Sequence, residues 1–185
     1  LGRLPEMLKG LRREFGSKPR AVRRGITPRA LRRAMDACLD PSVPEHANIR
    51  AALALALQGL LRGAEFAIDG GKRWRSKERL TRADVQRCDA QMLVLMMHPC
   101  KNMHHLSDKT CPLVIGAGGE YIDAVAEMRN LLRVDPVSDE VTADTPLFRV
   151  GAANAALTTE MVMGVTRQLM ASIGEDPAQF GTPSY

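Results

Sequence analysis

The chain has 185 residues, of which 45% are hydrophobic and 4% are aromatic, and its formal net charge is +5. This length can bury one good core with an appendage, but no run reaches the roughly 18 apolar residues that a membrane span needs. No charged-then-apolar leader opens the sequence, so we expect a protein that is not secreted. The cysteines lack a pairing pattern and favour reduced thiols: Cys38, Cys88, Cys100 and Cys111.

Positive charge is concentrated at the start of the chain. Residues 1–33 contain eleven Lys or Arg and two Glu, a net charge of +9, whereas the remainder has fifteen basic and nineteen acidic residues, a net charge of −4. This asymmetry is typical of a protein that binds a polyanion, and so many arginines favour a nucleic acid over a solubilising tail. We expect residues 1–25 to form a basic arm or interdomain linker. Residues 26–185 are predicted to form the folded domain.

The first predicted helices follow this arm. Thr27-Pro28 offers a helix cap with proline at the first helical position, and apolar residues then recur at helical spacing. Residues 40–44 are rich in proline and end that helix, and a second helix is predicted from about 45 to 66. Its residues 51–61 are almost all apolar, which indicates burial on every side.

Arg62 and Glu65 interrupt this apolar stretch. An arginine cannot lose its charge, so a buried one needs an anionic partner. Glu65 lies three residues on and is close enough on a helix to supply it, which gives a purely structural ion pair. The alternative is an arginine fixed at the floor of a cleft to bind an external anion, for which phosphate is the natural candidate. The residues alone leave both interpretations open.

Residues 69–87 form a second basic zone that contains Trp74 and a short capped turn at 80–85. Interleaved basic and aromatic residues suit contact with a nucleic-acid backbone, although a solvated loop would look the same. Residues 91–97 and 110–115 are predicted strands of a hairpin, followed by a helix at about 119–133 and a loop at 134–146. An extended piece at 147–150 precedes a last helix, capped at Thr158 or Thr159 and ending near Gly174. The predicted fold class is therefore α+β, mainly α-helical, with a small antiparallel β-hairpin or sheet.

Two further patterns suggest ligands. A zinc site is conceivable at His98, Cys100, His104, His105 and Cys111, but zinc sites usually present two close-spaced pairs, so no metal is predicted. Gly116-Ala-Gly-Gly119 resembles a dinucleotide-binding turn, yet the third glycine is missing and a hairpin is the wrong context for a βαβ unit. A nucleotide-binding protein is the weaker alternative, and no cofactor is predicted.

Gly59-Leu-Leu-Arg-Gly-Ala-Glu-Phe66, followed by Leu80-Thr-Arg-Ala-Asp-Val85, resembles the first signature box of the tyrosine recombinases, the phage-integrase family. In that family a hairpin with a catalytic lysine comes next, and this sequence offers one. Phe180-Gly-Thr-Pro-Ser-Tyr185 is similar to the approach to the second box, His-x-x-Arg. The resemblance covers roughly residues 26–185 and has the character of DIRS-like and Crypton-like recombinases from eukaryotic mobile elements.

The resemblance implies strand cleavage and rejoining of DNA through a phosphotyrosyl intermediate, without a metal. It assigns Arg62 as the first catalytic arginine, Glu65 as its structural support, and Lys101 as the lysine that protonates the leaving oxygen, with Lys109 as the alternative. The partner would be double-stranded DNA, with a homo-oligomer on DNA also compatible. The protein would be nuclear in a eukaryote and cytoplasmic otherwise. DNA contacts are expected from the arm and the second basic zone: Arg20, Arg23, Arg24, Lys72, Arg73, Arg75, Lys77, Arg79 and Arg82.

The sequence also departs from the family. Pro183 stands where the second box has histidine, and the second arginine and the nucleophilic tyrosine would follow Tyr185. We therefore expect a fragment of a longer protein, in which the 185 residues alone do not cleave DNA. The alternative is a DNA-binding relic of a mobile element that has lost catalysis.

Overall fold

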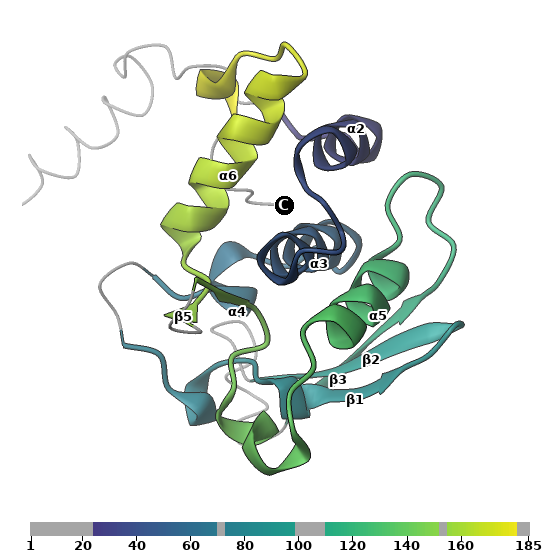
Figure 1. Cartoon of the computed structure of the whole chain (residues 1–185), viewed down its shortest axis with the longest axis vertical. Helices are drawn as coiled ribbons and strands as arrows, with labels where there is room; N and C mark the ends of the chain where they lie inside the picture. Colours follow the sequence, from purple (N-terminus) through teal and green to yellow (C-terminus); the bar gives the residue numbers. More distant parts are fainter. Residues whose placement is uncertain (1–23, 70–72, 99–109, 152–154, 181–185) are drawn as a thin grey trace, which may run out of the picture.

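The computed structural model describes residues 24–69, 73–98, 110–151 and 155–180. It confirms the predicted α+β, mainly helical fold with a small antiparallel sheet (Figure 1). Short 3₁₀ turns connect the main elements: η1 (Ser76–Glu78), η2 (Arg82–Asp84), η4 (Asp139–Asp144) and η5 (Pro177–Gln179). These are α2 (Pro28–Cys38), α3 (Pro44–Gln58), α4 (Gly63–Phe66), β1 (Val85–Cys88), β2 (Met92–Met97), β3 (Cys111–Gly116), α5 (Ala124–Val134), β4 (Arg149–Val150), β5 (Ala155–Ala156) and α6 (Thr159–Ser172).

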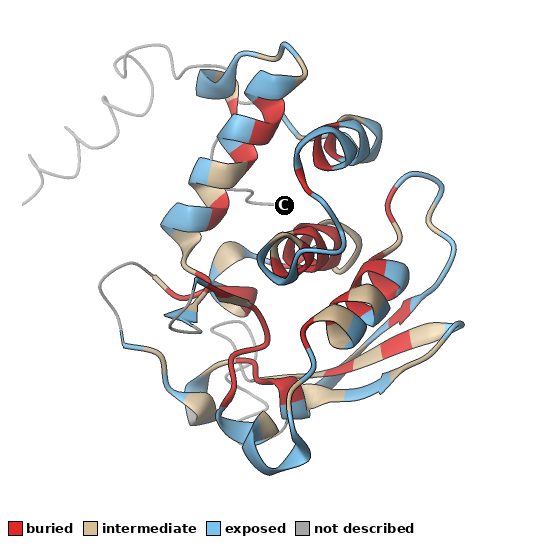
Figure 2. Cartoon of the chain, viewed as in Figure 1, coloured by how far each residue is buried: buried red, intermediate tan, exposed pale blue. Residues whose placement is uncertain are grey.

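Helix α3 is the centre of the core. It lies between α5 on one side and α2 and α6 on the other (Figure 1), and most of its length is buried (Figure 2). Its buried side chains are mainly alanine and leucine, and the small alanines allow neighbouring helices to approach closely. Burial on every side was predicted from the apolar run and is confirmed for residues 51–56.

The helices that flank α3 begin at side-chain caps. Thr27 Oγ1 accepts a hydrogen bond from the Ala30 N–H at 3.2 Å, and Pro28 occupies the first turn of α2, as predicted. Thr158 Oγ1 caps α6 by accepting from the Met161 N–H at 3.1 Å. Helix α5 begins at Ala124 after the cap residue Asp123, five residues later than the predicted start at about Gly119, because residues 117–123 form an irregular connection instead.

The sheet has the strand order β1-β2-β3 and is antiparallel throughout. Leu95 is the register partner of Leu113, and Met97 is the partner of Cys111, so the predicted hairpin is confirmed. Strand β1 was not predicted, since it is only four residues long and carries Arg87 among the charges of the basic zone. Inward-facing residues of the sheet are buried beneath α5, whereas Val114 remains 58% exposed on the opposite face.

The predicted helix from 45 to 66 is not continuous. Helix α3 ends at Gln58, and Leu60 adopts a left-handed backbone conformation with φ of 51°. This residue is 71% exposed, and Leu61, 5% exposed, returns the chain to the core before α4 begins. Glycine at 59 favours such a break because a glycine inside a helix costs about 1 kcal/mol relative to alanine.

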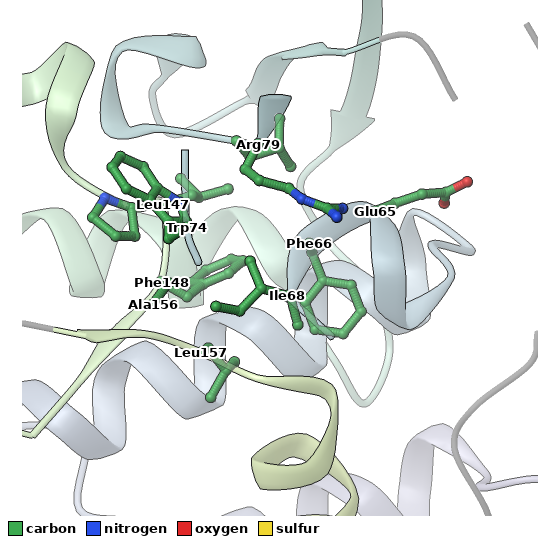
Figure 3. Close-up of a pocket in the computed structure, with 12 residues that line it drawn as sticks. Glu65, Phe66, Ile68, Trp74, Arg79, Leu147, Phe148, Ala156 and Leu157 are labelled. Carbon is green, nitrogen blue, oxygen red and sulfur yellow. The ribbon is translucent and has the colours of Figure 1, made fainter. Parts of the chain in front are cut away.

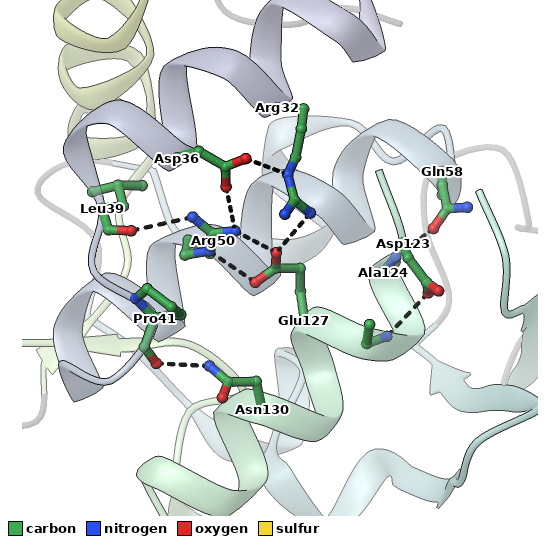
Figure 4. A network of polar contacts seen from close by, with 11 residues as sticks. Arg32, Asp36, Leu39, Pro41, Arg50, Gln58, Asp123, Ala124, Glu127 and Asn130 are labelled. Atoms are coloured by element: carbon green, nitrogen blue, oxygen red, sulfur yellow. Dashed lines mark hydrogen bonds and ion pairs between the residues drawn. The ribbon is translucent and has the colours of Figure 1, made fainter. Parts of the chain in front are cut away.

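A buried polar cluster joins α2, α3 and α5 (Figure 4). The Arg50 guanidinium is 3% exposed and binds Glu127 through two hydrogen bonds of 3.0 and 2.7 Å. It also donates to Asp36 and to the Leu39 carbonyl oxygen, each at 3.1 Å. Arg50 thus has carboxylate partners on two other helices, which compensates for taking its charge out of water.

A second buried cluster lies where η2 meets the segment after α5. Arg82 is 4% exposed and donates to Asp135 at 2.8 Å and to Asn48 at 3.2 Å. Arg149 binds the same carboxylate from β4. Burial, opposed in part by the Asp135 charge, lowers the pKa of Arg82 to about 10, so the guanidinium stays charged at neutral pH. Within the described residues, no helix has the length and apolar character to cross a membrane.

Candidate nucleic-acid interface

Arg62 is the N-cap residue of α4 and is exposed. The sequence predicted that Arg62 would continue the buried helix, but α3 ends at Gln58 and Arg62 follows the left-handed turn at Leu60, where it is exposed. Glu65 contacts it through the main chain: the Arg62 N–H donates to Glu65 Oε2 at 2.8 Å. The glutamate therefore fixes the backbone from which the Arg62 side chain projects.

Arg79 brings a second guanidinium to the same short helix. Its Nη1 donates to the Ala64 carbonyl oxygen at 2.9 Å, and its side chain lies along α4 beside Glu65 (Figure 3). Arg79 is separated from Ala64 by 15 residues, so nothing in the local sequence pattern shows this contact. The fold therefore gathers Arg62, Glu65 and Arg79 at α4.

Helix α4 is fixed to the core at its other end. Phe66 packs edge-on against Phe148, with ring centroids 6.4 Å apart. The Ile68 N–H donates to the Leu157 carbonyl at 3.0 Å, and the Ile68 carbonyl accepts from Thr159 at 2.8 Å. A small crevice beside these rings is lined by Trp74, which is half-buried (Figure 3). Part of the Trp74 side chain therefore packs against the protein, and the rest stays accessible.

The hairpin packs against the turn that precedes Arg62. A Cβ atom added at Gly59 would lie 3.2 Å from Leu113 Cδ2 on β3, so this strand lies directly against the turn. The hairpin thus has a defined position relative to the start of α4. Its connecting segment, with the two candidate lysines Lys101 and Lys109, lies outside the described residues.

Asp84 links the base of the hairpin to η2. Its Oδ2 accepts from the Thr81 N–H at 2.7 Å and from the Thr81 hydroxyl at 2.9 Å, which is the capped turn predicted at 80–85. The same oxygen lies 3.1 Å from His98 Nε2 at the end of β2. Sequence reasoning considered His98 only as a zinc ligand and missed this contact.

The other residues of the suspected zinc cluster give no metal site in the described structure. Cys111 is exposed on β3, and Cys100, His104 and His105 lie outside the described residues. Across the described ranges, no three metal-ligating side chains come together.

The remaining predicted DNA contacts are scattered. Arg73 and Arg75 are exposed after the gap at 70–72, and Arg75 pairs with Glu78 at 3.1 Å. Arg24 lies near η5, where its N–H donates to the Gln179 carbonyl at 3.0 Å. Four positions have no described side chain: Arg20, Arg23, Lys72 and Lys77.

For Arg82, the structure contradicts the predicted DNA contact. It was expected at a DNA-binding surface, but its side chain is 2% exposed and bound to Asp135. The partner lies 53 residues away in the chain, which is why the local pattern could not distinguish Arg82 from Arg79. A buried guanidinium of this kind positions η2 and cannot contact a macromolecular phosphate directly.

The glycines at 116–119 have a structural explanation. Strand β3 runs antiparallel to β2, so no βαβ unit surrounds this turn. A Cβ at Gly119 would lie 1.9 Å from the Ile122 carbonyl oxygen, which only glycine can avoid. The packing of the chain on itself therefore accounts for this glycine, without a nucleotide.

A scan of protein-family models and a search of curated proteins gave no match to this chain.

Proposed function

We propose that this chain is a DNA-binding part of a site-specific recombinase of the tyrosine-recombinase type. The observation that carries the proposal is Arg62, exposed at the start of α4 and braced through its backbone by Glu65. An exposed guanidinium on a fixed backbone suits a phosphodiester, because its planar donors match two phosphate oxygens. Arg79, bonded to the same helix, adds a second positive charge to this surface.

The proposed reaction follows from the resemblance, and the arrangement at α4 supports its first part. In the complete protein a tyrosine hydroxyl would attack the DNA phosphorus, forming a phosphotyrosyl bond while the bond to the 5′-oxygen breaks. Arg62 would stabilise the negative charge that develops on the non-bridging oxygens. Lys101, or alternatively Lys109, would donate a proton to the departing 5′-oxygen.

The second candidate is a DNA-binding relic without catalysis. Pro183, at the place where the resemblance puts a histidine, is the observation that favours it. Both candidates share the DNA-binding surface at α4 and differ only in strand cleavage. A longer version of the protein, incubated with a suicide DNA substrate, separates them by whether a covalent protein–DNA complex accumulates.

DNA binding itself is tested on the 185-residue chain by fluorescence anisotropy with labelled duplex DNA at several salt concentrations. We expect the affinity to fall steeply with salt, because each neutralised phosphate adds about 0.9 to the slope of log K against log salt. The Arg62→Ala variant should bind about tenfold more weakly, since a charge-assisted hydrogen bond contributes about 1.5–3 kcal/mol.

Arg133→Ala is the matched control for this experiment. Arg133 is an exposed arginine on α5, with a hydrogen bond to Asn130 at 2.7 Å, and it has no part in the α4 surface. Its loss removes the same formal charge and should change the affinity much less. Equal weakening by the two variants would show that only net charge matters and would contradict the assignment of Arg62.

A further inference from the structure

Leu60 occupies a backbone position that ordinarily belongs to glycine. Helix α3 ends in a Schellman-type turn, in which the Leu61 N–H donates to the Ala56 carbonyl oxygen at 3.0 Å. The residue before Leu61 in such a turn is left-handed, and here it is a leucine with φ of 51°. This leucine is also 71% exposed. An exposed apolar side chain on a strained backbone indicates a role in binding, because the core gains nothing from it.

Leu60 lines a groove between the end of α3, the start of α2 and the segment before α5. The volume of this groove is about 580 Å³, within the roughly 300–1,000 Å³ of ligand pockets. Tyr121, which is 40% exposed, lies in the same lining. The other lining residues used below are Thr27, Leu57, Glu120 and Ile122. The groove therefore presents a mainly apolar surface to whatever enters it.

Two walls of the groove are fixed to each other. Gln58, at the end of α3, accepts a hydrogen bond through Oε1 from the N–H of Ala124, the first residue of α5 (Figure 4). Gly119 packs closely on the same side chain, since a Cβ atom added there would lie 2.6 Å from Gln58 Nε2. A segment that docks in the groove therefore finds these walls already in place and does not have to order them.

The chain that leads into the groove has a matching sequence. Residues 1–23 lie outside the described residues, and their apolar positions 4, 7, 8, 11 and 15 have the spacing of one helix face. Lys9 and Arg13 fall on the opposite face of such a helix. Glu120 is an exposed carboxylate in the lining, so the groove carries a charge that attracts this basic segment.

This apolar stripe is covalently attached at the groove itself. Thr27 is part of the lining, and Phe15, the last residue of the stripe, precedes Thr27 by 12 residues. A connection of that length can span up to about 40 Å, so the stripe can return to the groove of its own molecule. Tethering by a short linker gives an effective concentration in the millimolar range, at which modest apolar contacts suffice for docking.

We propose that residues 4–15 dock in this groove as an amphipathic helix, with their apolar stripe against Leu60 and Tyr121. The docked helix covers these two exposed side chains and presents Lys9 and Arg13 to solvent. The basic arm is thereby held on the body of the protein. This inference does not depend on DNA binding, so it stands or falls separately from the proposed function.

The test is hydrogen exchange of the full 185-residue chain, followed by mass spectrometry. Amides of residues 4–15 should exchange about tenfold more slowly than in the free peptide, as for a segment docked about nine-tenths of the time. Leu60→Gly should bring their exchange to within about twofold of the peptide, because it removes the apolar side chain. Its urea midpoint should not fall, since glycine adopts the left-handed turn without strain.

Tyr121→Ser is a second groove variant and should remove the protection as Leu60→Gly does. Met161→Ser is the matched control and should keep it, because Met161 is 45% exposed on α6, away from the groove lining. Wild-type exchange as fast as in the free peptide would overturn the proposal, as would protection that survives both groove variants. Protection that increases with protein concentration would also overturn docking within one chain and would identify the groove of a second copy as the acceptor.

Discussion

The chain uses its arginines in two different settings. Arg50 and Arg82 are buried and bind carboxylates from distant segments, whereas Arg62 and Arg79 lie at α4, where they contact its backbone. Arg79 and Arg82 lie three residues apart in the same basic zone, whereas Arg50 and Arg62 lie in or next to apolar stretches. The comparison of Arg79 with Arg82 shows that a long-range carboxylate partner, and not the local density of positive charge, decides whether an arginine is buried in the fold.

Breaking the buried ion pair Arg50–Glu127 should cause the largest loss in the free energy of unfolding. Glu127→Ala leaves the guanidinium without its two-bond partner, and breaking a buried ion pair in this way costs about 3–5 kcal/mol. The free energy of unfolding in urea measures the loss. Glu140→Ala, at an exposed position on η4, should change it by no more than about 0.5 kcal/mol. Similar losses in the free energy of unfolding for the two variants would mean that the buried ion pair does not stabilise the fold more than an exposed residue does.

Replacing Asp135 should cause the next largest loss in the free energy of unfolding, and this loss should depend on pH. Burial raises the pKa of its carboxyl, but hydrogen bonds from Arg149 and Asn48 and the nearby positive charges outweigh burial, so the pKa lies below its ordinary value. A lowered pKa in the folded state means that this stabilisation is present above the ordinary carboxyl pKa of about 3.9. It is lost as the pH falls from there through the folded-state pKa.

Asp135→Asn should therefore cost about 1.5–3 kcal/mol at neutral pH, because two arginines lose their charged acceptor. The loss should shrink as the pH falls below about 3.9, because the stabilisation that the wild-type carboxylate contributes is itself lost there. Urea unfolding at neutral pH and at about pH 3 measures both values. A difference between wild type and variant that is the same at both pH values would show that the charge of Asp135 is not what stabilises the cluster.

Glu65 should give the smallest change in stability and a larger change in DNA binding. Glu65→Ala removes the acceptor for the Arg62 N–H, a loss comparable to that of a helix cap, about 1 kcal/mol. Because the backbone under Arg62 is then less constrained, DNA affinity should fall as well. Glu65→Gln keeps an acceptor oxygen and should therefore retain most of the stability and most of the DNA affinity. Full DNA affinity in Glu65→Ala would refute the bracing role.

The sequence predicted what depends on neighbouring residues. Thr27 and Thr158 were recognised as caps because cap, proline and apolar spacing lie within a few positions, and the hairpin was recognised from its two apolar runs. Glu65 was predicted to pair with the side chain of Arg62 three residues before it, whereas the contact that the structure shows is with the Arg62 backbone N–H.

Contacts between distant residues could not be predicted in this way. Arg82 and Asp135 are 53 residues apart, and Arg50 and Glu127 are 77 apart, so no periodicity relates them. The break after α3 depends on a left-handed turn at Leu60, a residue type that rarely marks one. The DNA-binding role of Arg62 and the catalytic role of Lys101 remain predictions.

The hydrogen bonds of Ile68 have a consequence for biosynthesis. This residue anchors the end of α4 to Leu157 and Thr159, which are made about ninety residues later on the ribosome. A nascent chain that has emerged only as far as the hairpin contains α4 and Arg62, but it lacks Leu157 and Thr159, which bind Ile68. The geometry at α4 should therefore be completed late, after α6 has begun to form.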